Sequence, residues 1–235
     1  IMHNFLCLCL QLLLLSIALT VSCVLGESAM VAFLVLQMLC ANLLVLKLVV
    51  IFGLEVTTCD AYAIAALLCI NLLREFYGSR HATRAILLTA FFGITIATVF
   101  YLHNLWIPSP HDKMHTPYQV LLQPVSSIFS ISLLVSLITW FCDYTLFTTL
   151  SQPSFALSLS ARMTICILIS QALDTFLFTL WALGPWLFDF WLLFFWSYVV
   201  KILTTWLLVP LVISFVHMLK KYKSFHSFYF NYASI

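Results

Sequence analysis

Seven long apolar stretches run through the chain, and each is long enough to cross a lipid bilayer as a helix. They cover residues 5–25, 29–52, 58–77, 83–106, 125–148, 161–183 and 188–216. A helix needs about 20 consecutive apolar residues to cross the hydrocarbon core. Polar and turn-forming residues separate the stretches, where the chain can leave the membrane. The pattern predicts seven spans, and six or eight stay open because two of the breaks are short.

The composition supports an integral membrane protein. Apolar residues make up 64% of the 235 residues and charged residues only 8%, whereas a soluble chain is about 25% charged. This excludes a soluble enzyme, a disordered chain and a nucleic-acid-binding protein. The apolar runs are continuous rather than alternating, which argues against a β-barrel. We therefore predict an all-α fold, a polytopic transmembrane helical bundle whose surroundings are the lipid bilayer.

Basic residues collect on one side of this predicted bundle. That side holds the loop after the third stretch, the start of the sixth and the tail after the seventh, with Arg80, Arg84, Arg162, Lys220, Lys221 and Lys223. Lys and Arg are enriched in the cytoplasmic loops of membrane proteins. We therefore predict a cytoplasmic C-terminus and an N-terminus on the outside.

Among the ionisable residues inside predicted spans, three stand out by their depth. They are Lys47 in the second stretch, Asp174 in the sixth and Lys201 in the seventh. Each costs about 2.5–3.5 kcal/mol on insertion scales, so such residues mark a function or a partner. Asp174 and Lys201 have similar depth on consecutive antiparallel spans, and we expect them to meet. The alternative is that these groups only hold helices together.

Neutral polar groups at depth add to this set. Asn42, Asn71 and Gln171 lie within apolar stretches, and Gln171 shares a helical face with Asp174, with Ser170 beside it. An amide, a carboxylate and a hydroxyl together suit a planar, hydrogen-bonding solute that is uncharged or cationic. Asp174 is also a candidate for coupling transport to protons.

No motif for catalysis or for a bound metal stands out. The chain has no Gly-rich phosphate loop and no serine in a nucleophile motif. His111 and His115 are four residues apart but follow two prolines in a loop, and we predict no metal site and no cofactor there. Polar groups at mid-depth favour passage of a solute over chemistry, so we do not expect an enzyme. Trp140, Phe178 or Trp196 could stack on a flat ligand.

Five motifs in order carry a resemblance to a known family. They are Ala41-Asn42 with Lys47, Leu72-Leu73-Arg74-Glu75-Phe76-Tyr77-Gly78 with Arg84, Asp143-Tyr144-Thr145-Leu146-Phe147, Ser170-Gln171-Ala172-Leu173-Asp174-Thr175, and Ser197-Tyr198-Val199-Val200-Lys201 with Pro210. Their order and spacing, from about residue 30 to 216, resemble the queuosine precursor transporter family. The chain departs from the pattern of many members at Asn71 and Trp140, where those members carry aspartate and glutamine.

The resemblance implies a domain organisation and a set of functional residues. A transporter core of six spans would cover 29–217, with an extra N-terminal transmembrane helix at 1–28 and a cytoplasmic tail at 218–235. The residues expected to bind substrate are Asn42, Lys47, Asn71, Gln171, Asp174 and Lys201. The polar residues expected to serve gating or structure are Glu75, Arg84, Asp143 and Ser170.

The function implied is import of a 7-deazaguanine precursor of the tRNA base queuosine into bacterial cells. The candidates are preQ0, preQ1 and queuine, carried across the bacterial plasma membrane by a chain that could form a homo-oligomer. Two alternatives stay open. One is the substrate-binding subunit of a vitamin-uptake system that needs a partner ATPase, and the other is a membrane scaffold without transport.

Overall fold

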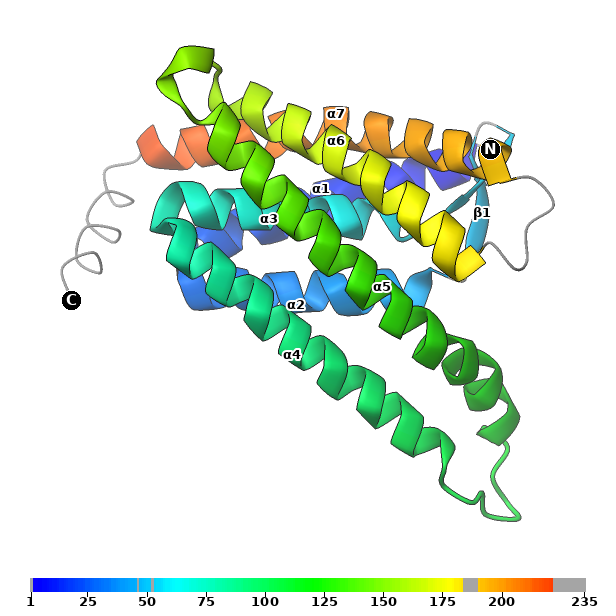
Figure 1. The fold of residues 1–235 in the computed structure, drawn as a ribbon. Coiled ribbons are helices and arrows are strands. Elements are labelled where there is room, and N and C mark those ends of the chain that lie inside the picture. The colour runs from blue at the N-terminus through cyan, green and yellow to red at the C-terminus, as the bar shows by residue number, and fades with distance from the viewer. Residues whose placement is uncertain (1, 46, 52, 184–189, 222–235) are drawn as a thin grey trace.

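The computed structural model describes residues 2–45, 47–51, 53–183 and 190–221, and most of them are helical (Figure 1). The long helices are α1 (Met2–Leu25), α2 (Glu27–Leu44), α3 (Asp60–Tyr77), α4 (Ser79–Asn104), α5 (His115–Leu150), α6 (Leu159–Phe178) and α7 (Phe190–Lys221). A short 3₁₀ helix, η1 (Pro153–Phe155), precedes α6, and a π-helical turn, η2 (Thr179–Leu183), follows it. The predicted all-α bundle is confirmed.

Within the described residues, six of the helices are long and apolar enough to cross a membrane. These segments are His3–Leu25, Glu27–Leu44, Ser79–Asn104, Ile128–Leu150, Leu159–Ala182 and Phe190–Met218. The stretch predicted at 58–77 forms α3, which has 18 residues and carries three charged residues, Asp60, Arg74 and Glu75. The chain is therefore a multi-pass membrane protein in which α3 differs from the other long helices.

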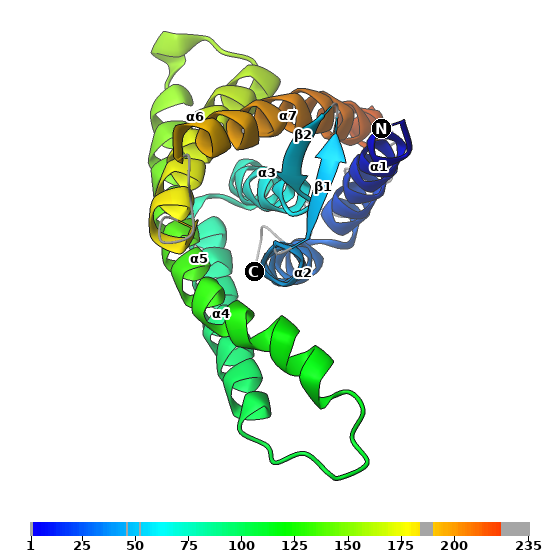
Figure 2. The same cartoon turned by 90° about the vertical axis from the view of Figure 1, so that its right-hand side faces the viewer.

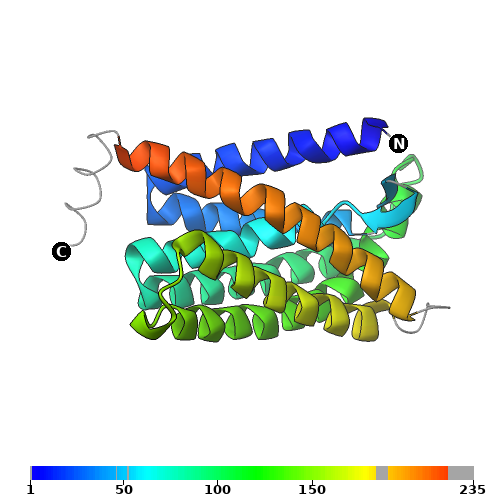
Figure 3. The ribbon, with the colours of Figure 1, turned by 90° about the horizontal axis from the view of Figure 1, so that it is seen from above.

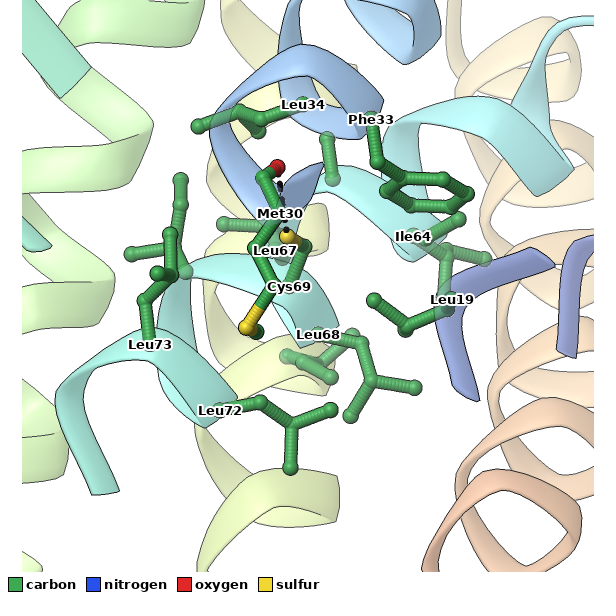
Figure 4. Packing of buried hydrophobic residues seen from close by; sticks show 14 of the residues in the cluster. Leu19, Met30, Phe33, Leu34, Ile64, Leu67, Leu68, Cys69, Leu72 and Leu73 are labelled. Atoms are coloured by element: carbon green, nitrogen blue, oxygen red, sulfur yellow. Dashed lines mark hydrogen bonds between the residues drawn. The ribbon is translucent and has the colours of Figure 1, made fainter. Parts of the chain in front are cut away.

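Helix α3 is the central element of the bundle (Figure 2). Twelve of its 18 residues are buried, and α1, α2, α4, α5, α6 and α7 all contact it. Figure 4 shows one part of this core, where Leu19 of α1 and Phe33 of α2 surround Ile64 of α3. The Cys69 thiol donates to the Met30 carbonyl across the same contact, with a separation of 3.4 Å. Polar residues on α3 are therefore held in place by packing on every side.

The second predicted span, 29–52, is wrong beyond residue 44. Helix α2 ends at Leu44, and the strands β1 (Leu48–Ile51) and β2 (Leu54–Thr57) form an antiparallel hairpin. Valine and isoleucine dominate this segment and favour strands, and Gly53 adopts a positive φ of 84° at the turn. A short apolar run does not distinguish helix from strand by its periodicity, which is why the sequence pattern misled.

The hairpin is fastened to two helices. Asn4 of α1 donates to the Val50 carbonyl at 2.9 Å, and Gln11 of α1 donates to the Thr58 carbonyl at 3.2 Å. Ile51 and Val56 pack with Val200 of α7. Helix α1 itself runs beside α7 at one edge of the bundle (Figure 3). The N-terminal helix therefore supports the hairpin.

The fifth helix extends well beyond its predicted span. The predicted span 125–148 agrees with the apolar segment Ile128–Leu150, whereas α5 itself begins at His115 and has 36 residues, and α4 and α5 extend together beyond the other helices (Figure 1). The polar residues at 115–119 continue the helix into the region outside the apolar stretch. Hydropathy marks where a helix is apolar, not where its hydrogen bonding begins.

The two ends of the bundle differ in charge. We call the end with the β1–β2 hairpin and the N-terminus the hairpin end. The opposite end, which we call the basic end, holds the α3–α4 junction, the α5–α6 loop and the C-terminal end of α7, with Arg80, Arg84 and Arg162 (Figure 1). Lys223 and the rest of the predicted tail from 222 onward lie outside the described residues. The cytoplasmic position of the basic end stays a prediction.

A candidate solute cavity

A cavity of about 400 Å³ lies between five helices and the hairpin. The C-terminal half of α2, the start of α3, the middle of α5, the end of α6 and the first half of α7 form its walls. Leu48 and Thr57 of the hairpin line it at the hairpin end, whereas Ala66 and Thr139 line it near the middle of the bundle. The cavity therefore reaches from the hairpin end to mid-depth.

A network of three charges lies in its wall. The Lys201 ammonium is 2.7 Å from Asp174 Oδ2 and 3.7 Å from Asp60 Oδ1, and Lys201 is only 5% exposed. The predicted contact of Asp174 with Lys201 is therefore confirmed. Asp60 is the first residue of α3, where the helix dipole stabilises a negative charge. Two carboxylates against one ammonium leave this wall with an excess of one carboxylate.

Polar atoms without a partner gather in the same cavity. In the part of the chain that the structure describes, five buried side-chain atoms that lack a hydrogen bond belong to residues that line it, namely Gln37 Oε1, Asn42 Oδ1, Asp60 Oδ2, Thr139 Oγ1 and Gln171 Oε1. Buried polar groups are nearly always hydrogen-bonded, so each exception calls for an explanation. The Asn42 amide nitrogen already donates to the Met38 carbonyl at 2.8 Å, which leaves its oxygen free to accept. The set suits a ligand that is rich in hydrogen-bond donors.

Apolar and aromatic surfaces complete the cavity. Trp140, which is 5% exposed, and Phe178 both line it, as do Met38 and Ile128. Thr179, the first residue of the π-helical turn η2, lines it as well. Aromatic walls with a few polar groups are typical of sites for small molecules, and π-helical turns occur frequently at functional sites.

The structure brings together four of the six residues predicted to bind substrate. Asn42, Gln171, Asp174 and Lys201 line the cavity. Lys47, which was placed inside a span, is exposed in the segment between α2 and β1, because α2 ends before it. Asn71 is fully buried on α3 and is not among the lining residues.

Asp60 and Gln37 were missed. Both lie inside or at the edge of apolar stretches, so their polarity could have marked them as candidate site residues. Asp60 lies at the start of its stretch, where a charge is ordinary, and only the fold shows that this helix start is buried beside Lys201. Gln37 is 2% exposed in the middle of α2.

A second polar group of residues lies deeper, toward the basic end. Ser170 of α6 donates to Asp143 Oδ1 of α5 at 3.1 Å, and Asn71 of α3 faces the same carboxylate. All three residues are 0% exposed. Ser170 and Asp143, predicted as gating or structural residues, are thus in direct contact.

Polar contacts bind α3, α5 and α6 together at the basic end. Arg74 of α3 donates to the Tyr144 carbonyl at 2.6 Å and to the Thr148 hydroxyl. Glu75 is 3.4 Å from Arg162 of α6, whose other nitrogen donates to Ser151 at 2.7 Å. We call Arg74, Glu75, Ser151 and Arg162 the basic-end cluster.

The guanidinium groups of Arg74 and Arg162 each lie 5.2 Å from the centre of the buried Phe147 ring. Arg84, also predicted as a gating residue, is instead exposed near the start of α4.

Comparison with known sequences identifies the family. Residues 61–215, about two thirds of the chain, match the family described as "putative vitamin uptake transporter". The chain belongs to this family of membrane transporters. No curated protein and no solved structure matches it. The prediction of a transporter is confirmed at this level.

The vitamin uptake transporter family match covers most of the cavity wall and the whole basic-end cluster. Asp174, Lys201, Asp143 and Arg74 all fall within the matched residues, whereas α1, α2 and the hairpin precede them. A cavity at one end of the bundle and a closed cluster at the other is an arrangement that a carrier needs, because a solute must reach its site from one side at a time.

Proposed function

We propose that this transporter imports a 7-deazaguanine precursor of queuosine through the cavity between α2, α3, α5, α6 and α7. The observation that carries the proposal is the set of unpartnered, mostly accepting atoms around the Asp60–Lys201–Asp174 network. A deazaguanine presents N–H and NH₂ donors along one edge. It also lacks the ring acceptor that guanine has at position 7, because a carbon atom replaces that nitrogen. A donor-rich planar base is what these acceptors suit.

Each part of such a base has a partner in the wall. The carboxylates of Asp174 and Asp60 accept from the ring N–H and the exocyclic amine, and the Gln171 amide donates to the ring carbonyl. Trp140 and Phe178 stack on the faces of the base. Base–aromatic stacking is worth about 1–3 kcal/mol per base. Adenine reverses the donor and acceptor pattern of this edge, so it leaves polar groups unpaired on both sides.

The excess carboxylate favours a cationic member of the class. preQ1 carries a protonated aminomethyl group and queuine a protonated secondary amine, whereas preQ0 carries a neutral nitrile. A positive charge near Asp60 and Asp174 balances the charge of the network, which has one ammonium for two carboxylates. We therefore expect preQ1 and queuine to bind more tightly than preQ0.

Uptake by the purified chain alone, reconstituted in liposomes with tritiated preQ1, tests the function. Accumulation without ATP supports a self-sufficient carrier, with adenine a weak competitor and unlabelled preQ1 a strong one. Binding of preQ1 without uptake would point to a substrate-binding subunit that needs a partner ATPase. Neither binding nor uptake of any of the three compounds would refute the deazaguanine proposal.

Import also requires that the cavity face the outside, which fits a cytoplasmic basic end in the bacterial plasma membrane. Lys47 and Arg80 are both exposed and lie at opposite ends. In a variant without native cysteines, Lys47→Cys should react with an impermeant thiol reagent in intact cells, and Arg80→Cys only after permeabilisation. The reverse labelling would invert the proposed orientation.

A further inference from the structure

A buried carboxylate that does not line the solute cavity lies between α3, α5 and α6. Asp143 is 0% exposed, and its Oδ2 atom has no hydrogen-bond partner. Its Oδ1 atom accepts from Ser170, and among the described residues no ion pair involves Asp143. An ionised carboxylate that is buried without a cation is so costly that such groups become neutral instead. The geometry of Asp143 therefore calls for a bound proton.

Arg74 is the charged residue that acts on Asp143, but its guanidinium contacts other groups. It acts on Asp143 from α3, but its guanidinium donates to the Tyr144 carbonyl and to Thr148 and lies 4.4 Å from the centre of the Tyr144 ring. Arg74 is thus held one residue farther along α5 and is not paired with the carboxylate.

The other titratable neighbours are thiols. They are Cys142 on α5 and Cys166 on α6, and Arg162 lies beyond Cys166 in its ion pair with Glu75. In the part of the chain that the structure describes, no titratable group of α2, α4 or η2 acts on Asp143. Arg74 is therefore the cation that can respond when the charge of Asp143 changes.

Polar groups connect this carboxylate to the cavity. Thr139 lies one helical turn before Asp143 on the same face of α5, lines the cavity, and has a hydroxyl without a partner. On the facing helix, Asn71 is fully buried, and its amide faces the Asp143 carboxylate. A proton from water in the cavity thus has hydrogen-bonding groups to follow toward Asp143.

We propose that Asp143 holds a proton in this conformation and is the site at which transport is coupled to proton movement. The proton enters from cavity water past Thr139 and binds a carboxylate oxygen of Asp143. When the proton passes from Asp143 to water at the basic end, the carboxylate becomes an anion in a medium of low dielectric and attracts Arg74. Arg74 then gives up Tyr144 and Thr148, and the basic end loosens. Proton binding at Asp143 does not require the solute to be a deazaguanine.

Infrared spectroscopy of the purified full chain tests the bound proton without any solute. At neutral pH the wild type should show the carbonyl stretch of a protonated carboxylic acid, and Asp143→Asn should remove it. Asparagine keeps the size of aspartate and can still accept from Ser170, so the variant should fold. Asp112→Asn, in the exposed α4–α5 loop, is the matched control and should keep the band.

A second variant keeps Asp143 and is informative even if Asp143→Asn proves unstable. Ser170→Ala removes the hydroxyl that donates to Asp143, so it should shift the frequency of the same band. A wild type without the band, or a band that neither Asp143→Asn nor Ser170→Ala alters, would overturn the proposal.

Coupling itself is measured in proteoliposomes with tritiated preQ1. In Asp143→Asn, uptake driven by a pH gradient should fall to the level of protein-free liposomes, while exchange of internal for external solute continues. Uptake by Asp143→Asn that still follows the gradient would refute the coupling role. Failure of preQ1 with every variant would count against the solute proposed above, and the infrared band would remain the test of Asp143.

Discussion

The two ends of the bundle differ in whether their polar groups have partners. At the hairpin end, polar atoms surround a cavity of about 400 Å³ and several of them lack partners. At the basic end, the charged side chains of α3 and α6 are paired, with Glu75 bonded to Arg162 and Arg74 to the backbone of α5. One end is prepared for a ligand, and the other is closed by contacts within the protein.

Helix α3 extends from one end to the other, which explains why a helix with three charged residues lies at the centre of an apolar bundle. Asp60 begins it beside the cavity, and Arg74 and Glu75 end it in the basic-end cluster. A rigid helix that contacts both regions can transmit a change in one to the other. The difference between the ends is what a carrier that opens alternately to each side requires.

Removal of Lys201 should have the largest effect on this arrangement. Lys201→Met leaves the buried Asp60 and the half-buried Asp174 without their cation, and breaking a buried ion pair costs about 3–5 kcal/mol. We expect loss of uptake and a marked fall in the melting temperature of the purified protein. Thermal unfolding and uptake in liposomes measure the two effects.

The matched control removes all three charges together. Asp60→Asn, Asp174→Asn and Lys201→Met combined should regain the melting temperature but not transport. The double variant Asp174→Asn with Lys201→Met keeps Asp60, and it should stay unstable because the Asp60 carboxylate remains unpaired. Normal transport by the triple variant would show that the network is only structural.

An intermediate effect is expected for a cavity amide. Gln171→Leu removes the amide that we assign to the ring carbonyl, and an unmatched polar group on a bound ligand costs about 1–3 kcal/mol, or roughly 5- to 150-fold in affinity. The measurement is the Kd for preQ1 by equilibrium binding to the purified protein.

Thr204→Val is the control for that change. Thr204 of α7 also has a buried hydroxyl without a partner, but it does not line the cavity. Its replacement should leave the Kd unchanged. Equal weakening by both variants would mean that the effect arises from packing and not from the cavity.

The smallest effect should come from the basic-end cluster. The Glu75 and Arg162 side chains are partly exposed, and such pairs contribute about 0.2–1 kcal/mol. Glu75→Gln should therefore shift the balance between the two access states by at most roughly fivefold. The charge swap, Glu75→Arg together with Arg162→Glu, should keep the wild-type balance. Thiol labelling of a Ser136→Cys reporter in the cavity measures that balance in each variant. A shift in this balance of more than fivefold that the charge swap does not reverse would contradict a role for the Glu75–Arg162 ion pair alone.

Much of the fold was predictable because lipid imposes helices on long apolar stretches. The contact of Asp174 with Lys201 followed from their similar depth on adjacent spans. The hairpin was not predictable from hydropathy, since valine and isoleucine are as apolar in a strand as in a helix. The predicted position of Lys47 inside a span was wrong for the same reason. Asp60 was not predicted as a site residue because a charge at the end of a span is ordinary, and only the fold shows that it is buried. The unpartnered state of Gln37 or Thr139 depends on tertiary packing, which no local pattern contains.

The most direct test of the solute cavity is protection of one cysteine by the solute. Ser136 of α5 lines the cavity, and Ser109 lies in the exposed α4–α5 loop. In a variant without the eight native cysteines, Ser136→Cys should react with a small hydrophilic thiol reagent, and preQ1 should slow that reaction in proportion to its occupancy while adenine does not. Ser109→Cys should react at the same rate with or without preQ1. An unchanged rate at Ser136→Cys, at preQ1 concentrations that saturate uptake, would contradict the assignment of this cavity as the solute site.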